Sequence, residues 1–406
     1  MMGLVFDTRP ARLAVAGGLS RLDPLWALAG PGPLGLRHIP DPTPPGPGWL
    51  TLLPRFTGVC GSDVTEATLQ ADWDNPLSGL VSFPHVMGHE VVAEVVDSAG
   101  SGFAIGETVV VNPWLGCAAR DLPACPECAA GLAPLCAHQG EPIPGVSGAG
   151  IHIGNIRGLP GGMGTRMVAH PAQLHRLPAG LEPRAGVLAD PVAVGAHAAE
   201  RAVVAGGSGL VVVLGAGTVG LAVTASLARL GARRVMVATA WRYQQPLVAA
   251  LGAEPIPRQP EPAVLRVAEA SRGRLTRPWR GIPWLVAGGA EAVVDAVGSA
   301  STAELALALV RPGGTVVRVG VGRARRSQAT LTYFKEVDLV GSNGYRRQDL
   351  DTALSMLAGD AIAWRDWLTH TLPLEGWRRA FRVATRPQRH AAVKVSLTIG
   401  TAIRRA

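Results

Sequence analysis

The sequence has almost no lysine. Of its 38 basic residues only Lys335 and Lys394 are lysines, and the others are scattered arginines. Because no basic stripe with interleaved aromatic residues occurs, the formal charge of +8 does not indicate nucleic-acid binding. No apolar run reaches the roughly 18 residues of a transmembrane helix. The start of the chain lacks a basic segment followed by an apolar stretch, so no signal peptide is predicted.

Cysteine is also scarce, and its placement is uneven. The 406 residues contain five cysteines, all between residues 60 and 136. Clustered cysteines suit metal binding in a reducing compartment better than a disulfide framework. With 48% hydrophobic and 17% charged residues, the chain can bury a large core, and its length suits two or three domains. We therefore expect a globular metal-binding protein in the cytoplasm.

Four of these cysteines form a compact set. Cys117, Cys125, Cys128 and Cys136 have seven, two and seven residues in the gaps between them. Four thiolates around one zinc ion make a closed structural site, and segment 116–140, which lacks a periodic hydrophobic pattern, would gain its core from the metal. Disulfides and a nucleic-acid-binding zinc ribbon are weaker alternatives, because a ribbon normally places its two ligand pairs far apart.

The fifth cysteine belongs to a different pattern. Cys60 stands in Gly-Val-Cys-Gly-Ser-Asp, upstream of Gly88-His89-Glu90. A soft thiolate and an imidazole suit a catalytic zinc, which needs a third protein ligand and keeps one position open. The alternative for these two residues alone is a buried core thiol and a hydrogen-bonded core histidine.

The hydrophobic pattern changes near residue 200. The first hundred residues contain short strand-like runs between Pro and Gly clusters, which indicate a β-rich domain. The continuous apolar run 210–214 is typical of a buried parallel strand, and further strands are predicted at 235–238, 292–295 and 315–319, with helices between them. We read 255–290 as surface loops plus one helix, and the strand-like run 391–397 as a return to the first domain.

A glycine-rich turn follows the strand at 210–214. Gly215, Gly217 and Gly220 stand between this strand and a predicted helix that begins near Thr218 and Val219. In this context the first glycine permits a tight turn, the second lets the backbone approach a pyrophosphate, and the third allows close packing of helix and strand. The sequence therefore predicts dinucleotide binding at the start of that helix.

The end of the second predicted strand bears on the choice between NAD and NADP. An acidic residue there would bind the ribose 2′-hydroxyl of NAD. This chain instead has Thr239, which can donate to a phosphate, and Arg242, which can pair with a 2′-phosphate. This pattern favours NADP over NAD.

Several segments together resemble one family. The runs 58–63, 88–90, 215–220, 293–298 and 311–314, in this order, resemble the zinc-containing alcohol and polyol dehydrogenases of the medium-chain dehydrogenase/reductase superfamily. The resemblance covers nearly the whole chain. It implies an α/β protein with a β-rich GroES-like catalytic domain at 1–200, a Rossmann domain with a doubly wound parallel sheet at 201–345, and a return to the catalytic domain at 346–406.

The resemblance also assigns roles around the catalytic zinc. Cys60, His89 and Asp190 would be its ligands, although Asp190 stands where the polyol branch has a longer glutamate. Glu90 would be the acidic residue behind the zinc that can exchange into the coordination sphere. Asp63 would orient the ligand histidine.

Proton transfer and the structural zinc show departures from the family pattern. Ser62 would pass on the substrate proton, but Thr65 stands where many relatives have a histidine that completes the relay. In the four-cysteine segment the first family cysteine would fall at Leu122, so Cys117 must replace it across a longer loop.

The biochemistry that follows from the resemblance is hydride transfer. Two zinc ions per chain, nicotinamide contacts near Val297, Val319 and Gly320, and a homodimer or homotetramer are expected. Zinc would act as a Lewis acid on the oxygen of an alcohol or polyol while hydride passes reversibly to the nicotinamide. Two alternatives are a zinc-free quinone or enone reductase of the same superfamily and a non-catalytic cofactor-binding relative.

Overall fold

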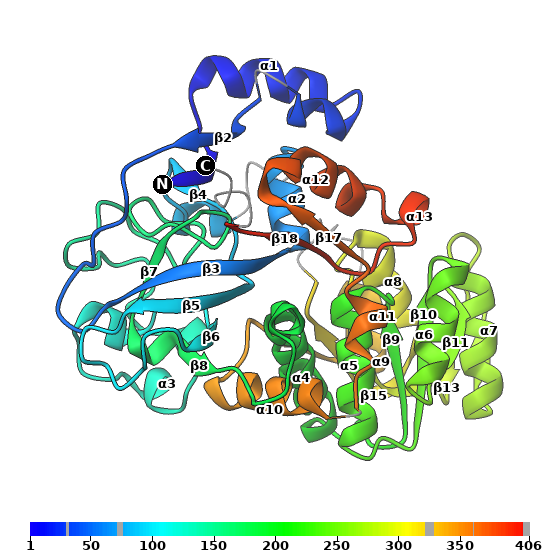
Figure 1. Cartoon of the computed structure of the whole chain (residues 1–406). Helices are drawn as coiled ribbons and strands as arrows, with labels where there is room; N and C mark the ends of the chain where they lie inside the picture. Colours follow the sequence, from blue (N-terminus) through cyan, green and yellow to red (C-terminus); the bar gives the residue numbers. More distant parts are fainter. Residues whose placement is uncertain (30–31, 71–75, 321–328, 360, 401–406) are drawn as a thin grey trace. The chain divides into compact units, whose positions relative to one another are not determined.

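The computed structural model describes residues 1–29, 32–70, 76–320, 329–359 and 361–400, drawn as a ribbon in Figure 1. The chain divides into two compact units. The first combines Met1–Asp190 with Arg346–Ala406, and the second is Pro191–Tyr345. Among the described residues, no helix is both long and apolar enough to cross a membrane.

The second unit is built on a six-stranded parallel sheet with the order β11-β10-β9-β14-β15-β16. Its strands are β9 (Leu210–Leu214), β10 (Arg234–Thr239), β11 (Glu254–Pro257), β14 (Ala290–Asp295), β15 (Val310–Arg318) and β16 (Asp338–Gly341). Its helices are α4 (Ala189–Val204, starting at the junction of the units), α5 (Thr218–Arg229), α6 (Gln245–Ala250), α7 (Pro260–Ser271), α8 (Ala300–Leu309) and α9 (Ala329–Lys335). Because the strand order reverses between β9 and β14, the sheet is doubly wound, and the predicted Rossmann fold is confirmed.

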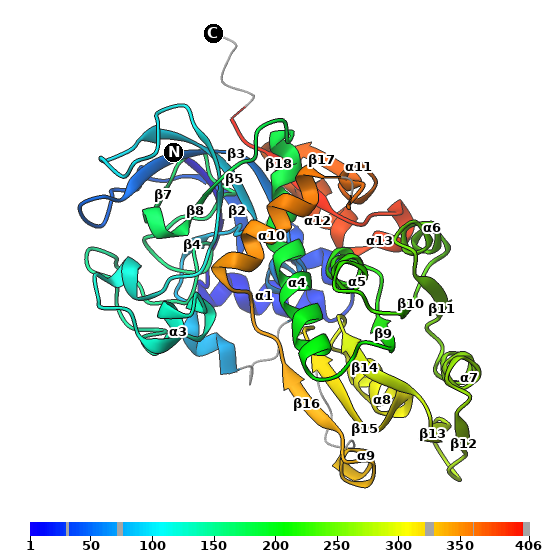
Figure 2. The same ribbon diagram turned by 90° about the horizontal axis from the view of Figure 1, so that it is seen from below.

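Apolar runs explain why this sheet is internal. Val211, Val212 and Val213 are fully buried, as expected for a parallel strand covered on both faces. Helix α5 contacts β9 and β10, whereas α8 contacts β14 and β15 and packs against α7. Figure 2 shows these helices beside the strands they cover.

The first unit is dominated by a seven-stranded sheet in which β7 pairs with β3 beside the order β17-β18-β3-β5-β6-β8. Its strands are β3 (Leu50–Val59), β5 (Val91–Asp97), β6 (Thr108–Val111), β7 (Met167–Ala169), β8 (Leu174–Arg176), β17 (His370–Pro373) and β18 (Val395–Thr398). A smaller sheet holds β1 (Met2–Phe6), β2 (Leu34–His38) and β4 (His85–Val86). The helices are α1 (Pro10–Ser20), α2 (Gly61–Ala67), α3 (Pro126–Ala129), α10 (Arg347–Ala358), α11 (Trp364–Trp367), α12 (Trp377–Thr385) and α13 (Pro387–His390).

The tail of the chain returns to the first unit as a strand. The predicted strand at 391–397 is β18, which pairs antiparallel with β3 so that Val395 lies opposite Val59. The residues that precede β18 and follow β3 are therefore neighbours, although more than 300 positions separate them in sequence. This pairing brings the tail beside Cys60.

One expectation about local structure was incomplete and another was wrong. The first hundred residues contain the predicted strands, as β1, β3 and β5, but also α1 at Pro10–Ser20, with proline in its first turn and alanines that favour helix. Segment 255–290 is not mainly loop. It contains β11 and a hairpin of β12 (Arg274–Thr276) and β13 (Trp284–Ala287), which is anchored by the fully buried Leu285.

One of the two lysines closes the end of a helix in the second unit. Lys335 is 1% exposed, and its ammonium donates hydrogen bonds to the carbonyl oxygens of Leu307 (2.7 Å) and Val310 (2.6 Å). The last carbonyls of a helix have no partner within it, and a cation there also interacts favourably with the helix dipole. Lys335 therefore caps α8 from α9, with its Nζ 5.6 Å from the centre of the Trp284 ring.

Replacing Lys335 with methionine should destabilise the second unit. The change keeps most of the side-chain volume but leaves buried carbonyls without a donor, so we expect a loss of about 1–3 kcal/mol in the free energy of unfolding. Urea denaturation of wild type and Lys335→Met measures this loss. Equal or higher stability of the variant would show that removing the buried charge outweighs the lost hydrogen bonds.

The same pair of proteins should differ more at higher pH. Burial lowers the pKa of Lys335 from 10.5 to about 7. Between these values the unfolded chain binds more protons at this site than the folded chain, so wild-type stability rises with pH in this window. The stability difference between wild type and Lys335→Met should therefore grow from about pH 7 to about pH 9. A difference that stays constant with pH would contradict the depressed pKa.

Candidate active site

Three potential metal ligands meet in the first unit. One donor atom each from Cys60, His89 and Glu90 lies within 4.8 Å of the other two. Cys60 follows β3 and caps the start of α2, while His89 and Glu90 immediately precede β5, the neighbour of β3 in the sheet. Sheet pairing therefore assembles a set that is split by 28 residues in sequence, and its sulfur, nitrogen and oxygen donors suit zinc.

Asp63 contacts both Cys60 and His89. Its Oδ2 accepts a hydrogen bond from the backbone N–H of Cys60 (2.8 Å), and its Oδ1 lies 3.6 Å from Nδ1 of His89. Burial raises the pKa of Asp63 to about 6, against the opposite effect of the nearby His89 charge. Because Asp63 occupies the Nδ1 side of the ring, the other nitrogen is left for a metal, as in many metal-bound histidines.

The surroundings of His89 favour a positive charge. Burial opposes protonation, but the charges of Asp63 and Cys60, with a further contribution from Asp190, raise the pKa of His89 well above its ordinary value. Glu90 is 2% exposed, and its carboxylate is paired with the ammonium of Lys394. A set that combines a thiol, an imidazole and a buried carboxylate fits a divalent cation.

Asp190 lies beside this set but not within it. It is 8% exposed in the first turn of α4, and its charge acts on His89. Among the described residues, the groups of mutually close donor atoms place Glu90, not Asp190, with Cys60 and His89.

The structure also locates the two hydroxyl groups on α2 that bear on proton transfer. Ser62 is exposed in the first turn of the helix. The hydroxyl of Thr65 donates to the carbonyl oxygen of Gly61 (2.9 Å), so it is committed to the helix backbone. Ser62 is therefore the more exposed of these two residues.

A second histidine beside His89 was missed from the sequence. The ring centres of His89 and His152 are 5.1 Å apart, and Trp114 lies edge-on to His152 at 5.5 Å. His152 Nδ1 donates to the carbonyl oxygen of Ile153 (2.8 Å), and its Nε2 accepts from the amide of Asn155 (3.0 Å). Burial and the neighbouring His89 lower the pKa of His152 to about 3, so it is a neutral wall of the site. The only signal in the sequence was a histidine in a glycine-rich loop.

The four remaining cysteines converge elsewhere in the first unit. Donor atoms of Cys117, Cys125, Cys128 and Cys136 all lie within 4.8 Å of one another, and none of the five cysteines forms a disulfide. Backbone N–H groups point at the sulfurs, and those of Ala137 and Cys128 lower the pKa of Cys125 to about 7. Such N–H groups stabilise thiolates, so the set fits a closed four-thiolate zinc site.

A buried arginine accompanies this set. Arg120 is 3% exposed, and its guanidinium donates to the carbonyl oxygens of Leu115 (2.5 Å), Gly116 (3.2 Å) and Gly150 (3.2 Å). Its charge interacts with nearby cysteines, Cys136 most strongly. Arg120 therefore compensates part of the negative charge that four thiolates would bring.

The glycine-rich turn of the second unit has the close contacts its pattern predicts. Gly215 has φ of +98°, and a Cβ on Gly220 would lie 1.9 Å from the carbonyl oxygen of Gly215. A Cβ on Gly217 would meet nothing within 4 Å, so the space at the N-terminus of α5, beside Thr218 and Val219, is open. Open space at a helix N-terminus fits a bound phosphate.

The predicted nicotinamide contacts meet at the carboxyl ends of β14 and β15. Oδ1 of the buried Asp295 accepts from the backbone N–H of Val297 (3.1 Å), and its carbonyl oxygen accepts from Val319 (3.1 Å) and Gly320 (3.0 Å). A Cβ on Gly320 would lie 2.3 Å from the carbonyl carbon of Val297. Asp295, which was not among the predicted site residues, thus holds this edge together.

The end of β10 offers an exposed cation and no carboxylate. Arg242 is exposed at the start of the turn 242–244. The hydroxyl of Thr239 is buried and donates to the carbonyl oxygen of Ile256 (3.3 Å), so it is already engaged within the sheet. Of these two predicted contacts, Arg242 is the one free to meet a 2′-phosphate.

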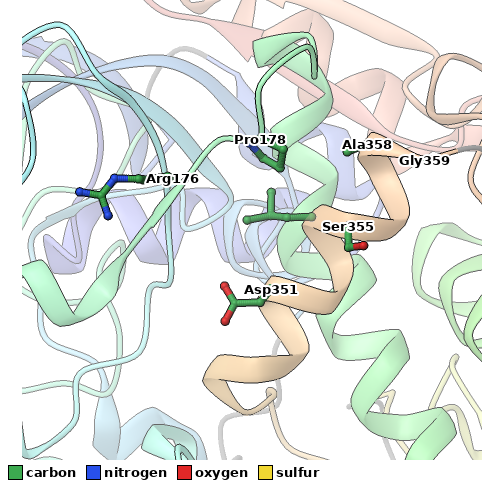
Figure 3. A pocket seen from close by; sticks show the side chains of 7 residues that line it. Arg176, Pro178, Asp351, Ser355, Ala358 and Gly359 are labelled. Carbon is green, nitrogen blue, oxygen red and sulfur yellow. The ribbon is translucent and has the colours of Figure 1, made fainter.

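A separate hollow of about 470 Å³ lies in the first unit, and Figure 3 shows the side chains that line it. Arg176 and Pro178 line one side, and Asp351 and Ser355 of α10 line the other. Asp351 Oδ1 lies 2.6 Å from Nδ1 of the buried His175. None of the predicted site residues lines this hollow, so we assign it no part in catalysis.

Comparison with known families agrees with this geometry. Residues 46–179 match the alcohol dehydrogenase GroES-like domain, and residues 218–359 match the zinc-binding dehydrogenase domain. The first match covers the donor set around Cys60 and the four-cysteine lobe, and the second covers α5 and every strand of the six-stranded parallel sheet except β9.

Curated relatives and solved structures point the same way. A Mycobacterium tuberculosis protein named "probable zinc-binding alcohol dehydrogenase" is 32% identical over 72% of this chain and 66% of its own length. Sorbitol dehydrogenase of Halalkalibacterium halodurans is 26% identical over 91% of this chain and 96% of its own. Galactitol-1-phosphate dehydrogenase of Escherichia coli has the same fold, with a TM-score of 0.72 at 22% identity, over 98% of this chain and 100% of its own.

These findings confirm the prediction of a zinc-dependent oxidoreductase that transfers hydride between an alcohol or polyol and a nicotinamide cofactor. The chain belongs to the zinc-containing alcohol and polyol dehydrogenase family of the medium-chain dehydrogenases/reductases.

Proposed function

We propose that this protein is an NADP-preferring polyol or secondary-alcohol dehydrogenase that binds two zinc ions per chain and works in the cytoplasm. The observation that carries the proposal is the convergence of one donor atom each from Cys60, His89 and the buried Glu90 within 4.8 Å of one another. Polyol substrates are favoured because sorbitol dehydrogenase and L-galactonate-5-dehydrogenase are among the relatives. Free cysteines suit a reducing compartment.

The catalytic zinc would be held by Cys60, His89 and one carboxylate. We take Glu90 as the resting ligand, because its oxygen lies within 4.8 Å of both other donors. Asp190, at the start of α4, is then the carboxylate that can exchange with it. The four cysteines of segment 117–136 would hold the second, structural zinc.

The residues of the chain divide the work of catalysis between them. Zinc bound at this set would supply a Lewis acid for the substrate oxygen, and a bound nicotinamide would supply the hydride acceptor. Asp63 fixes the ring of His89, and Ser62 takes the substrate proton and passes it toward solvent. His152 and Trp114 wall the site with neutral rings. Gly217 lets the pyrophosphate approach α5, and Asp295 holds the edge that contacts the nicotinamide.

The protein is proposed to be a homodimer or a homotetramer. β16 is an edge strand of the six-stranded sheet, and Leu339 on this strand is 62% exposed. Tyr333 and Phe334 on α9, which precedes β16, are 84% and 64% exposed. An unprotected edge with exposed apolar side chains is suited to pairing with a second copy.

Metal content and turnover test the function together. Wild type should contain about two zinc ions per chain and oxidise at least one member of a panel of secondary alcohols and polyols. Cys60→Ser should lose one zinc ion and lower turnover by more than about 100-fold, since loss of a ligand costs more than loss of a supporting residue. Metal analysis and a nicotinamide absorbance assay measure both.

Cys128→Ser is the matched control, because it removes the same thiol from the other set. It should lose the other zinc ion and destabilise the fold of segment 116–140. Wild type without zinc that reduces quinones or enones would support the zinc-free alternative. Wild type that binds cofactor but turns over no member of the panel would support the non-catalytic one.

Cofactor choice is tested at Arg242. Replacing Arg242 with alanine removes the cation available for the 2′-phosphate, so the KM for NADP should rise by roughly 10-fold or more while that for NAD stays unchanged. Arg233→Ala, another exposed arginine just before β10, is the control. Equal KM values for NADP in wild type and Arg242→Ala would remove Arg242 from the cofactor site.

The assembly is tested at Leu339. Leu339→Glu places a charge on the exposed edge strand, and a charge there blocks pairing with another strand. We expect the variant to have a smaller molar mass than wild type in light scattering coupled to size exclusion, with its fold intact by circular dichroism. An unchanged mass would place the interface elsewhere.

A further inference from the structure

The second lysine of the chain lies beside the proposed metal ligands. Lys394 is 4% exposed and directly precedes β18. We propose that Lys394 is a positioning residue that tethers Glu90, limits how strongly this carboxylate binds the catalytic metal, and so keeps one metal position available to substrate. The proposal rests on the metal site of the proposed function.

Lys394 and Glu90 form a close, buried ion pair. Nζ of Lys394 donates a hydrogen bond to Oε1 of Glu90 and also touches Oε2. The side chains are 5% and 1% exposed, so the pair is withdrawn from water. A Cβ on Gly58 would lie 1.9 Å from Oε2 of Glu90 and 2.9 Å from Cε of Lys394. The pair is therefore packed directly against the bare backbone of β3.

Three adjacent strands fix where the lysine can reach. β18 pairs with β3 so that Val395 faces Val59, which places the preceding Lys394 beside Cys60. On the other side of β3, the backbone N–H of Gly58 donates to the carbonyl oxygen of Glu90 (2.8 Å). The backbone of Lys394 is itself held, since its N–H donates to the carbonyl oxygen of Trp367 (2.9 Å). The tether thus has rigid anchors at both ends.

Charge explains why a tether is needed there. Glu90, Cys60 and Asp190 all act on Lys394 as negative groups. Buried anions without a counter-charge are costly, and one buried cation among them compensates part of that cost. A carboxylate with no other partner would turn both oxygens to a bound cation. Because Nζ of Lys394 contacts both oxygens of Glu90, it competes with a bound metal for this carboxylate.

Removing the tether should strengthen metal binding while it weakens turnover. In Lys394→Met, Glu90 loses its competing partner and can bind the metal through both oxygens. We expect release of the catalytic metal to a chelator to slow by at least about 10-fold, because close charge pairs couple by more than 1.4 kcal/mol. Turnover on the active substrate should fall. A residue that merely supports the fold would have the opposite effect on release, since its loss speeds metal escape.

Cobalt(II) is the probe, loaded into the catalytic site in place of zinc. Its visible absorption depends on coordination geometry and weakens when ligands are added to a four-coordinate site. Lys394→Met should show weaker absorption than wild type, and Lys394→Arg should keep the wild-type spectrum and release rate. The double variant Glu90→Gln with Lys394→Met should cancel the effect, because the tethered carboxylate is gone. If Lys394→Met does not fold, Lys394→Gln takes its place with the same expected direction.

Lys335→Met is the matched control, because it removes the other buried lysine, which lies in the second unit, and should leave the cobalt spectrum unchanged. An unchanged spectrum and release rate in Lys394→Met, or faster release, would overturn the tether. A wild-type protein that takes up no cobalt at Cys60 would instead refute the proposed metal site. The two failures are therefore distinguishable without any substrate.

Discussion

The first unit depends on holding several negatively charged side chains together where water is scarce. Cys60, Asp63 and Glu90 surround His89, and each is fixed by the backbone of β3, α2 or the start of β5. Like charges in a buried place repel one another and lose hydration, so such a set persists only with counter-charges. Lys394 and the expected cation supply them, since a histidine that binds a metal is itself neutral. Catalytic power and fold stability therefore draw on the same electrostatic balance.

The four-cysteine lobe also needs compensation for clustered negative charge, in this case the charge of thiolates. Four sulfurs gather in one small segment, and backbone N–H groups together with the buried Arg120 lower the cost of their charge. In the second unit the constraint is steric rather than electrostatic. Gly215, Gly220 and Gly320 stand where a single Cβ would strike backbone or a neighbouring side chain, while Gly217 faces open space. The first unit is therefore suited to a metal by the charges of its residues, and the second is suited to a dinucleotide by the space that its glycines leave open.

Structural features that depend on a short sequence segment could be predicted from the sequence. Contacts that depend on the pairing of strands far apart in the sequence could not. The apolar run 210–214 is β9 residue for residue, and the turn at Gly215 has the strained backbone that only glycine tolerates readily. The four cysteines predicted as one set do converge. By contrast, Lys394 reaches Glu90 across 304 residues, and only the register of β18 against β3 reveals the contact. The family resemblance predicts Asp190 as a metal ligand, and the structure additionally brings Glu90 within 4.8 Å of the Cys60 and His89 donors.

The placement of the two lysines has a consequence for the surface of the protein. Both ε-amino groups are buried, so every exposed basic side chain is an arginine or a histidine. Guanidinium groups keep their charge up to a pH of about 12, whereas lysine amines begin to lose theirs well below that. The positive surface should persist in alkaline solution, where a lysine-rich protein of the same net charge would already be neutralising. It also presents almost no target to reagents that acylate or cross-link amines.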